Sequence, residues 1–341
     1  MSIMPYNLQN KRILMFYPYG ATKHYGDAIK NELIQRGAEV QGYDERPSQK
    51  SLIKICIRLF KKKIPQIFSK YINHIISENR DKQFDYILVF RGEAFTKLSI
   101  RLLRDKYKDA KFILYLWDIL DTTNVRDIVP LFDRALSFDP ADASSINCLK
   151  FRPTFCVPAY EKVGTSINAH NDLMFVGTLH SKRHSTIQLI QKYFKIQGLR
   201  TYVYLYVPSI LVYIKDFICK FPYIGIEKVH FSPLSLDQTV EILSDCKCIL
   251  DINYSTQKSL SMRAYEALIS HRKFITTNSE IKKYDFYNKN NIYIIDITKP
   301  FIPQKFIDTP FETIDSSIVY KYTIKGFVDD LFDLEEPHFF R

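Results

Sequence analysis

The stretch from Lys258 to Asn278, KSLSMRAYEALISHRKFITTN, decides how the second half of this chain is interpreted. It reads as a basic loop followed by a helix that carries Arg263 and Glu266, with an apolar strand on either side. The N-terminus of a helix and nearby Lys or Arg side chains neutralise phosphate, and a carboxylate accepts hydrogen bonds from ribose hydroxyls. The pattern therefore suits a nucleoside diphosphate. An ordinary amphipathic helix with solvated charges is the alternative interpretation.

Length and composition predict a soluble protein of two domains. The chain has 341 residues, of which 46% are apolar and 25% charged, as is usual for globular proteins with more than one core. Only 10 residues are glycine, which argues against a glycine-fingerprint cofactor fold. The six cysteines lack zinc-knuckle spacing, and no signal peptide or apolar run of about 20 residues is present. We therefore expect reduced thiols and a cytoplasmic location.

Positive charge is concentrated in one segment. The net charge is +11, and the segment 50–80 holds eight basic residues and one acid, Glu78. Its apolar residues between Leu52 and Phe60 recur at helical spacing. A basic amphipathic helix can lie on an anionic membrane surface. A solvated surface helix is an equal alternative. No nucleic-acid-binding motif accompanies the charge, so we expect no nucleic-acid partner.

The first half predicts a parallel sheet. An apolar strand at 12–17, a loop at 18–26, a helix at 27–36 and a strand at 38–43 form a β-α-β unit. Open α/β sheets bind ligands at the carboxyl ends of their strands. The loop at 18–26 would lie at this edge, so Gly20 and His24 are candidates for an acceptor-side site. A solvated or structural histidine is the alternative for His24.

Two further strands end at ionisable residues. The strand at 84–90 is followed by Arg91, Gly92 and Glu93, and the strand at 111–116 by Trp117 and Asp118. Carboxyl ends of parallel strands share one edge of the sheet, so Glu93 and Asp118 are the candidate catalytic groups, with Arg91 on the acceptor side. Capping of a following helix is the alternative for both acids.

The pattern restarts after a polar stretch at 161–171. A strand at 173–176 is followed by a loop at 177–183, in which Gly177 permits close approach and Arg183 supplies positive charge beside a helix start. We expect Gly177 and Arg183 to join Lys258, Arg263 and Glu266 in one donor-binding site. We expect domains at 1–160 and 161–314, facing across a cleft, and a C-terminal helix and tail at 315–341.

The second half resembles the two-domain GT-B glycosyltransferases, in particular the CgeB-like and group-1 enzymes of bacterial surfaces. The similar stretches are residues 175–183, 235–243, 261–268 and 274–278. The resemblance implies two Rossmann-like domains, with a nucleotide sugar in the second domain, an acceptor in the first, and a last helix that crosses back to the first. It matches Glu266 to the acid that binds the donor ribose and Arg183 to a diphosphate ligand.

The sequence departs from that family at one informative position. Many retaining members have a glutamate eight residues before the equivalent of Glu266, where this chain has Lys258, and the usual Glu-Pro-Phe-Gly loop is absent. An inverting reaction would need a base from the first domain, for which Asp118 or Glu93 could serve. No Asp-X-Asp triplet is present, so we expect neither a metal ion nor a cofactor, with Lys258 and Arg263 stabilising the leaving diphosphate.

These observations predict a metal-independent glycosyltransferase of hexosyltransferase type. It would move a sugar from a nucleoside diphosphate sugar to a glycan or lipid-linked acceptor in the synthesis of surface polysaccharide or lipopolysaccharide. The segment 50–80 would bring it to the inner face of the membrane as a peripheral protein. The alternatives are a nucleotide-sugar epimerase of the same architecture and a non-catalytic protein that binds an anionic polymer or membrane.

Overall fold

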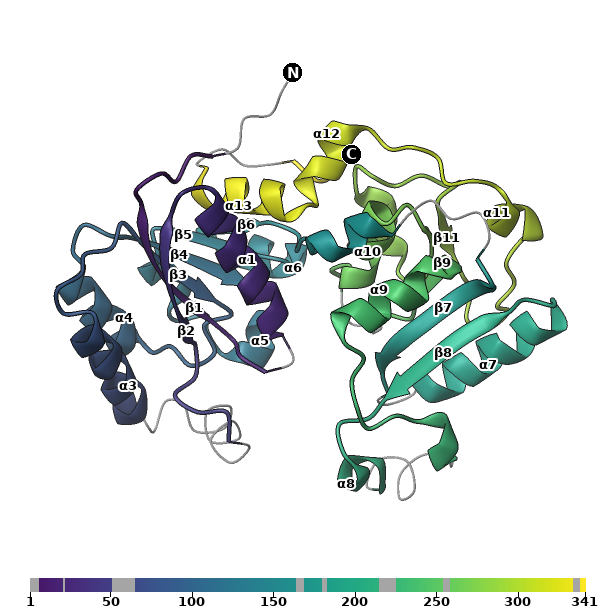
Figure 1. The fold of residues 1–341 in the computed structure, drawn as a ribbon, viewed down its shortest axis with the longest axis horizontal. Coiled ribbons are helices and arrows are strands. Elements are labelled where there is room, and N and C mark those ends of the chain that lie inside the picture. The colour runs from purple at the N-terminus through teal and green to yellow at the C-terminus, as the bar shows by residue number, and fades with distance from the viewer. Residues whose placement is uncertain are drawn as a thin grey trace. The chain divides into compact units, whose positions relative to one another are not determined.

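The computed structural model describes residues 6–20, 22–50, 65–163, 169–179, 183–214, 225–253, 258–333 and 338–341 (Figure 1). The side chains of Pro65, Arg183 and His184 lie outside this description. The chain forms two compact units, each built on its own sheet. The first unit comprises Met1–Phe155 and Ile324–Phe339, and the second comprises Cys156–Thr323 and Phe340–Arg341.

The first unit is built on a parallel sheet of six strands in the order β2-β1-β3-β4-β5-β6. The strands are β1 (Arg12–Tyr17), β2 (Glu39–Asp44), β3 (Tyr86–Phe90), β4 (Lys111–Leu116), β5 (Arg134–Ser137) and β6 (Leu149–Phe151). Five successive residues of β1 and of β4 are buried. Both faces of such strands are covered, which explains their uninterrupted apolar sequence. The predicted β-α-β unit is therefore confirmed.

Helices cover this sheet. They are α1 (Lys23–Gln35), α3 (Pro65–Glu78), α4 (Lys97–Lys106), α5 (Leu120–Thr123), the 3₁₀ helix η2 (Val129–Leu131), α6 (Pro140–Ser145) and α13 (Ile324–Phe332). The core between α3, α4 and the sheet is formed by residues such as Ile75, Leu103 and Phe112. Helix α1 begins four residues earlier than the sequence predicts. The basic pattern at 52–60 lies outside the described residues.

The C-terminal helix belongs to the first unit, as predicted. Helix α13 lies beside α1 (Figure 1), and the Phe327 ring packs edge-on against Tyr115 at 4.8 Å. The buried Arg152 guanidinium lies 2.7 Å from Asp330 Oδ2. In place of the single helix expected from residue 315, the chain forms two helices, α12 (Ser316–Lys321) and α13, which are separated by Tyr322 and Thr323.

The second unit is built on a parallel sheet of five strands in the order β11-β10-β9-β7-β8. The strands are β7 (Asn171–Thr178), β8 (Thr201–Tyr206), β9 (Cys246–Asp251), β10 (Lys273–Thr276) and β11 (Ile292–Ile294). The remaining elements, apart from α12, are η3 (Pro158–Lys162), α7 (Arg183–Ile196), α8 (Ile210–Tyr213), η5 (Ile226–Lys228), α9 (Leu236–Ser244), α10 (Met262–Ile269), η6 (Ser279–Lys283) and α11 (Gln304–Asp308).

One expectation for the second unit is wrong in detail. The loop expected from Gly177 begins later, because β7 stays paired with β8 as far as Thr178. Beyond the 3₁₀ turn η5, a single bridge joins Tyr206 to His230. Within the described part of the chain, no helix has the length and apolarity needed to cross a bilayer.

Candidate functional site

Helix α10 begins at the edge of the second sheet where the strands end. The sheet is parallel, so the carboxyl ends of β7, β9 and β10 lie at one edge, and the chain passes from β9 through this edge into α10. Asp251, at the end of β9, is buried there, as is Thr276 at the end of β10. Ligands of open α/β sheets bind at this edge.

Arg263 and Glu266 form an ion pair on α10. An Nη1 hydrogen of Arg263 is donated to Oε2 of Glu266, and Nη2 donates to the main-chain oxygen of Val176 at 3.3 Å. The Glu266 side chain is 3% exposed, while that of Arg263 is 22% exposed. Arg263 thus neutralises a buried carboxylate and links α10 to the end of β7, next to Gly177.

The N-terminus of α10 is not capped by the side chain that precedes it. Ser261 occupies the N-cap position without a side-chain cap, and its Oγ is buried with no hydrogen-bond partner among the described residues. Helix α9 provides a contrast, since Ser235 and Gln238 form a full capping box there. The first N–H groups of α10 and the Ser261 hydroxyl are suited to an anion.

The predicted donor residues are placed as follows. Arg263 and Glu266 are in contact, and Gly177 lies in β7, immediately after the residue that Arg263 contacts. Lys258 is exposed in the loop before α10. Arg183 is the first residue of α7, and its side chain lies outside the described residues.

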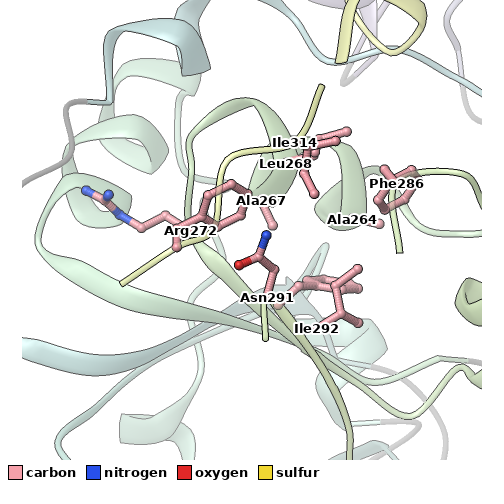
Figure 2. Close-up of a pocket in the computed structure, with 10 residues that line it drawn as sticks. Ala264, Ala267, Leu268, Arg272, Phe286, Asn291, Ile292 and Ile314 are labelled. Atoms are coloured by element: carbon pink, nitrogen blue, oxygen red, sulfur yellow. The ribbon is translucent and has the colours of Figure 1, made fainter. Parts of the chain in front are cut away.

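A small pocket lies against a different face of α10. Figure 2 shows Ala264, Ala267 and Leu268 lining it, together with Phe286 and Ile292. The Arg272 guanidinium points away from these side chains (Figure 2), and its Nε donates to the main-chain oxygen of Leu243 at 3.3 Å. Neither Arg263 nor Glu266 lines this mostly apolar pocket, which we regard as a packing feature.

In the first unit, Arg91 connects the two predicted catalytic acids. Its Nη2 lies 3.0 Å from Glu93 Oε2, and its Nε lies 2.8 Å from Asp118 Oδ2. The Glu93 side chain is 2% exposed and that of Asp118 is 43% exposed. The structure therefore brings together Arg91, Glu93 and Asp118, as the strand-end pattern predicts. Neither acid caps a helix: Thr96 caps α4, and Ile119 precedes α5.

Two members of this charged cluster are not apparent from the sequence. Arg46 Nη2 donates to Glu93 Oε2, and the fully buried Glu45 lies between Arg46 and Arg91. Both residues follow β2 directly, at the same sheet edge. They end a strand as Glu93 and Asp118 do, but β2 (EVQGYD) is polar and only half-buried, so no apolar run in the sequence marks this strand end. We call the set Glu45, Arg46, Arg91, Glu93 and Asp118 the strand-end cluster.

Arg91 has an unusual backbone conformation. Its φ is +73°, and Gly92 follows at +72°. A non-glycine residue in the left-handed region costs about 1–3 kcal/mol and persists where its surroundings hold it. The Arg91 N–H donates to the main-chain oxygen of Tyr115 at 2.8 Å. Arg91, which links Glu93 and Asp118, is therefore held in a strained backbone conformation.

The other acceptor-side candidates lie nearer to α1. His24 is in the first turn of α1, exposed and 4.0 Å from the Tyr25 ring between centroids, so its expected loop position is wrong. Gly20 has a φ of +93° and is exposed. Gly26 allows the Tyr17 ring to pack against α1, since a Cβ there would lie 1.9 Å from Tyr17 Cδ2. The close approach of the Tyr17 ring to the Gly26 backbone thus serves packing within the first unit.

Comparison with models of protein families and with curated proteins gives no match. Among solved structures, the glycotransferase of kitacinnamycin is 13% identical, with 96% of this chain and 100% of that chain covered and a TM-score of 0.50. The UDP-GlcNAc 2-epimerase from Methanocaldococcus jannaschii is 10% identical, with 94% and 99% covered and a TM-score of 0.50. Phytolacca americana UGT2, complexed with UDP-2-fluoro-glucose and pterostilbene, is 9% identical, with 96% and 91% covered and a TM-score of 0.50. The chain therefore has the two-domain parallel α/β fold of these proteins, the GT-B fold.

Proposed function

We propose that this protein is a glycosyltransferase that moves a sugar from a nucleoside diphosphate sugar to a hydroxyl group of a glycan or lipid-linked acceptor. The observation that carries the proposal is the pairing of Arg263 with the buried Glu266 carboxylate beside the uncapped start of α10, at the carboxyl edge of a parallel sheet. This arrangement offers a carboxylate for ribose and N–H groups and cations for a diphosphate. The same fold holds a UDP-linked sugar in Phytolacca americana UGT2.

The roles of the donor-site residues follow from their chemistry. Glu266 would accept hydrogen bonds from the ribose hydroxyls, held in place by Arg263. The N–H groups at the start of α10, the Ser261 hydroxyl and the exposed Lys258 would bind the diphosphate. As the bond between the sugar and the diphosphate breaks, these groups would stabilise the negative charge of the leaving group without a metal ion.

The strand-end cluster of the first unit would serve the acceptor. Asp118 is its most exposed carboxylate. We assign to Asp118 the role of general base, which takes the proton of the acceptor hydroxyl as its oxygen forms a bond to the anomeric carbon. Arg91 and Glu93 would orient Asp118. A base in this role corresponds to an inverting transfer.

The setting we propose is the assembly of surface polysaccharide or lipo-oligosaccharide at the inner face of the membrane. Its support is the resemblance of residues 170–300 to CgeB-like and group-1 enzymes and the basic excess of segment 50–80. A polybasic segment contributes about 1 kcal/mol per Lys or Arg near an anionic membrane. The basic residues from Lys54 to Lys63 lie outside the described residues.

A nucleotide-sugar epimerase is the second candidate, because an epimerase has this fold at the same TM-score as the two transferases. An epimerase changes a nucleotide sugar with no acceptor present. A transferase requires an acceptor for turnover at a comparable rate. Incubation with nucleotide sugars alone, followed by chromatography, therefore separates the two activities.

The proposal is tested by a thermal-shift screen against UDP-, GDP-, CMP- and dTDP-linked sugars. A ligand at 100 times its Kd stabilises the folded protein by about 2.7 kcal/mol. We expect one nucleotide class to raise the melting temperature. No shift with any of the four classes would contradict a donor site.

A further inference from the structure

The Arg91 guanidinium faces two carboxyl groups through the same nitrogen. Its Nε lies 2.8 Å from Asp118 Oδ2 and 3.8 Å from Glu45 Oε1; both contacts are ion pairs, and Nε makes no hydrogen bond among the described residues. The two carboxyl groups differ in their surroundings, since the Asp118 side chain is 43% exposed and that of Glu45 is fully buried. One cation is therefore shared between a carboxylate at the surface and a carboxyl group in the interior.

Glu45 has few polar contacts for a buried acid. Neither of its carboxyl oxygens has a hydrogen-bond partner among the described residues, and the nearest charged atoms are Arg91 Nε at 3.8 Å and Arg46 Nε at 3.9 Å. Arg46 is engaged by Glu93 through Nη2. An ionised carboxylate that accepts no hydrogen bond in the interior is costly, so this geometry favours a neutral Glu45.

Some of the charged groups around Glu45 raise the pKa of its carboxyl group, and others lower it. Burial raises the pKa of Glu45 to about 8; Arg91 and Arg46 oppose this rise, and Glu93 and Asp44 add to it. Asp118 belongs to the same set through Arg91. At neutral pH the proton therefore stays on Glu45, and the charge of Arg91 is directed to Asp118 and Glu93.

We propose that Glu45 is a positioning residue for Asp118, acting through the Arg91 guanidinium that the two carboxyl groups share. The assignment rests on the proposed function only where Asp118 is the acceptor-side base. While Glu45 is protonated, Arg91 holds Asp118. When Glu45 releases its proton to solvent, the new buried charge attracts Arg91 inward in a medium of low dielectric constant, and the hold on Asp118 weakens.

The backbone around Arg91 confines this movement to the side chain. The left-handed conformation of Arg91 and Gly92 is fixed by the hydrogen bond from Arg91 N–H to Tyr115 O, and Gly92 is packed so that a Cβ would lie 3.3 Å from Leu114 Cδ1. Both carboxyl oxygens lie within 3.8 Å of Arg91 Nε, so the guanidinium can favour one or the other without a change in the main chain.

The test is carbon-13 NMR of the full chain labelled at the carboxyl carbons of Asp and Glu. The Asp118 signal is assigned by its loss in Asp118→Asn, and the Glu45 signal by its loss in Glu45→Gln. In the wild type we expect the Asp118 signal to show a step with a midpoint near pH 8 that coincides with the titration of Glu45. That step should be absent in Glu45→Gln.

Two further variants keep the test decisive. Glu39→Gln changes an exposed glutamate on β2, the strand that directly precedes Glu45, and should leave the Asp118 step in place. Arg91→Gln removes the shared cation, so it should abolish the step and move the titration of Glu45 to higher pH, which can be followed even if Glu45→Gln does not fold. A Glu45 titration in the usual range of carboxyl groups, or an Asp118 step that persists in Glu45→Gln or Arg91→Gln, would overturn the proposal. These measurements need no nucleotide, so failure of the donor site would leave them unaffected.

Discussion

The Arg263 guanidinium donates a hydrogen bond to the Glu266 carboxylate three residues further along α10, and in doing so compensates an acid that is almost fully buried. A second hydrogen bond from Arg263 reaches Val176 at the end of β7. Arg263 thus neutralises Glu266, the candidate residue for binding ribose, and also attaches α10 to the end of β7 beside Gly177.

Arg263→Ala should destabilise the second unit. It leaves the Glu266 carboxylate buried without its cation, which costs about 3–5 kcal/mol. Urea denaturation monitored by circular dichroism measures the effect. Lys283→Ala is the matched control, because Lys283 pairs with Glu280 at the same spacing on the surface and such pairs contribute about 0–1 kcal/mol. Equal losses in the two variants would show that the Arg263–Glu266 pair has no special role.

Glu45→Gln should remove a loss of stability that the wild type undergoes as pH rises from about 4.5 to 8. The folded-state pKa of Glu45, about 8, lies above its ordinary value of 4.5, so the folded state holds a proton that the unfolded state has lost. Stability contributed by this proton is complete below about pH 4.5 and is lost as pH rises towards 8. The advantage of Glu45→Gln over the wild type should grow across that window and then level off. A difference in unfolding free energy that does not change with pH would contradict a raised pKa.

Gly26→Ala should destabilise the first unit although alanine favours helices. The new Cβ would lie 1.9 Å from Cδ2 of the buried Tyr17, and overpacking of this kind costs about 1–3 kcal/mol. The comparison is Asn31→Ala, at an exposed position of the same helix, where we expect a change within about 0.5 kcal/mol. A stabilising Gly26→Ala would mean that Tyr17 does not pack as described.

Arg152→Met should loosen the C-terminal helix from the first unit. The substitution removes the cation that faces Asp330 of α13 at 2.7 Å, in a position with no exposed surface. It also removes the guanidinium from the Phe327 and Phe339 rings, whose centroids lie 5.1 Å and 4.9 Å away. Breaking a buried pair costs about 3–5 kcal/mol. Limited trypsin digestion should release the C-terminal segment faster than in the wild type. Unchanged digestion would show that other contacts hold α13.

The sequence predicts strands such as β1 and β4, and helix α10, because these depend on local patterns. Apolar runs such as 12–17 and 111–116 have the length of buried strands and are shorter than most helices. Arg263 and Glu266 lie three residues apart on one helix, so their contact follows from helical spacing. Glu93 and Asp118 follow neighbouring strands, and the parallel sheet brings them to one edge.

The remaining features depend on contacts that spacing does not encode. Glu45 follows β2, and it approaches Arg91 only because the sheet order is β2-β1-β3. Gly177 was expected in a loop because glycine favours turns, yet its pairing with Leu205 keeps it in β7. Helix α1 was expected to begin after Gly26, because this glycine was assigned to a loop, yet it lies within α1, where it makes room for the Tyr17 ring.

The donor site itself is tested by isothermal titration of the wild type, Glu266→Gln and Glu280→Gln with UDP, GDP and dTDP. Gln keeps the size of the Glu266 side chain but replaces the carboxylate, whose oxygens would accept hydrogen bonds from the ribose hydroxyls, with a neutral amide. A hydrogen bond to a charged group contributes about 1.5–3 kcal/mol. We expect one nucleotide to bind the wild type and the Glu280→Gln control with equal Kd, and to bind Glu266→Gln at least about tenfold more weakly. The same Kd for Glu266→Gln and the wild type, or no binding of any of the three nucleotides, would contradict a nucleotide site at α10.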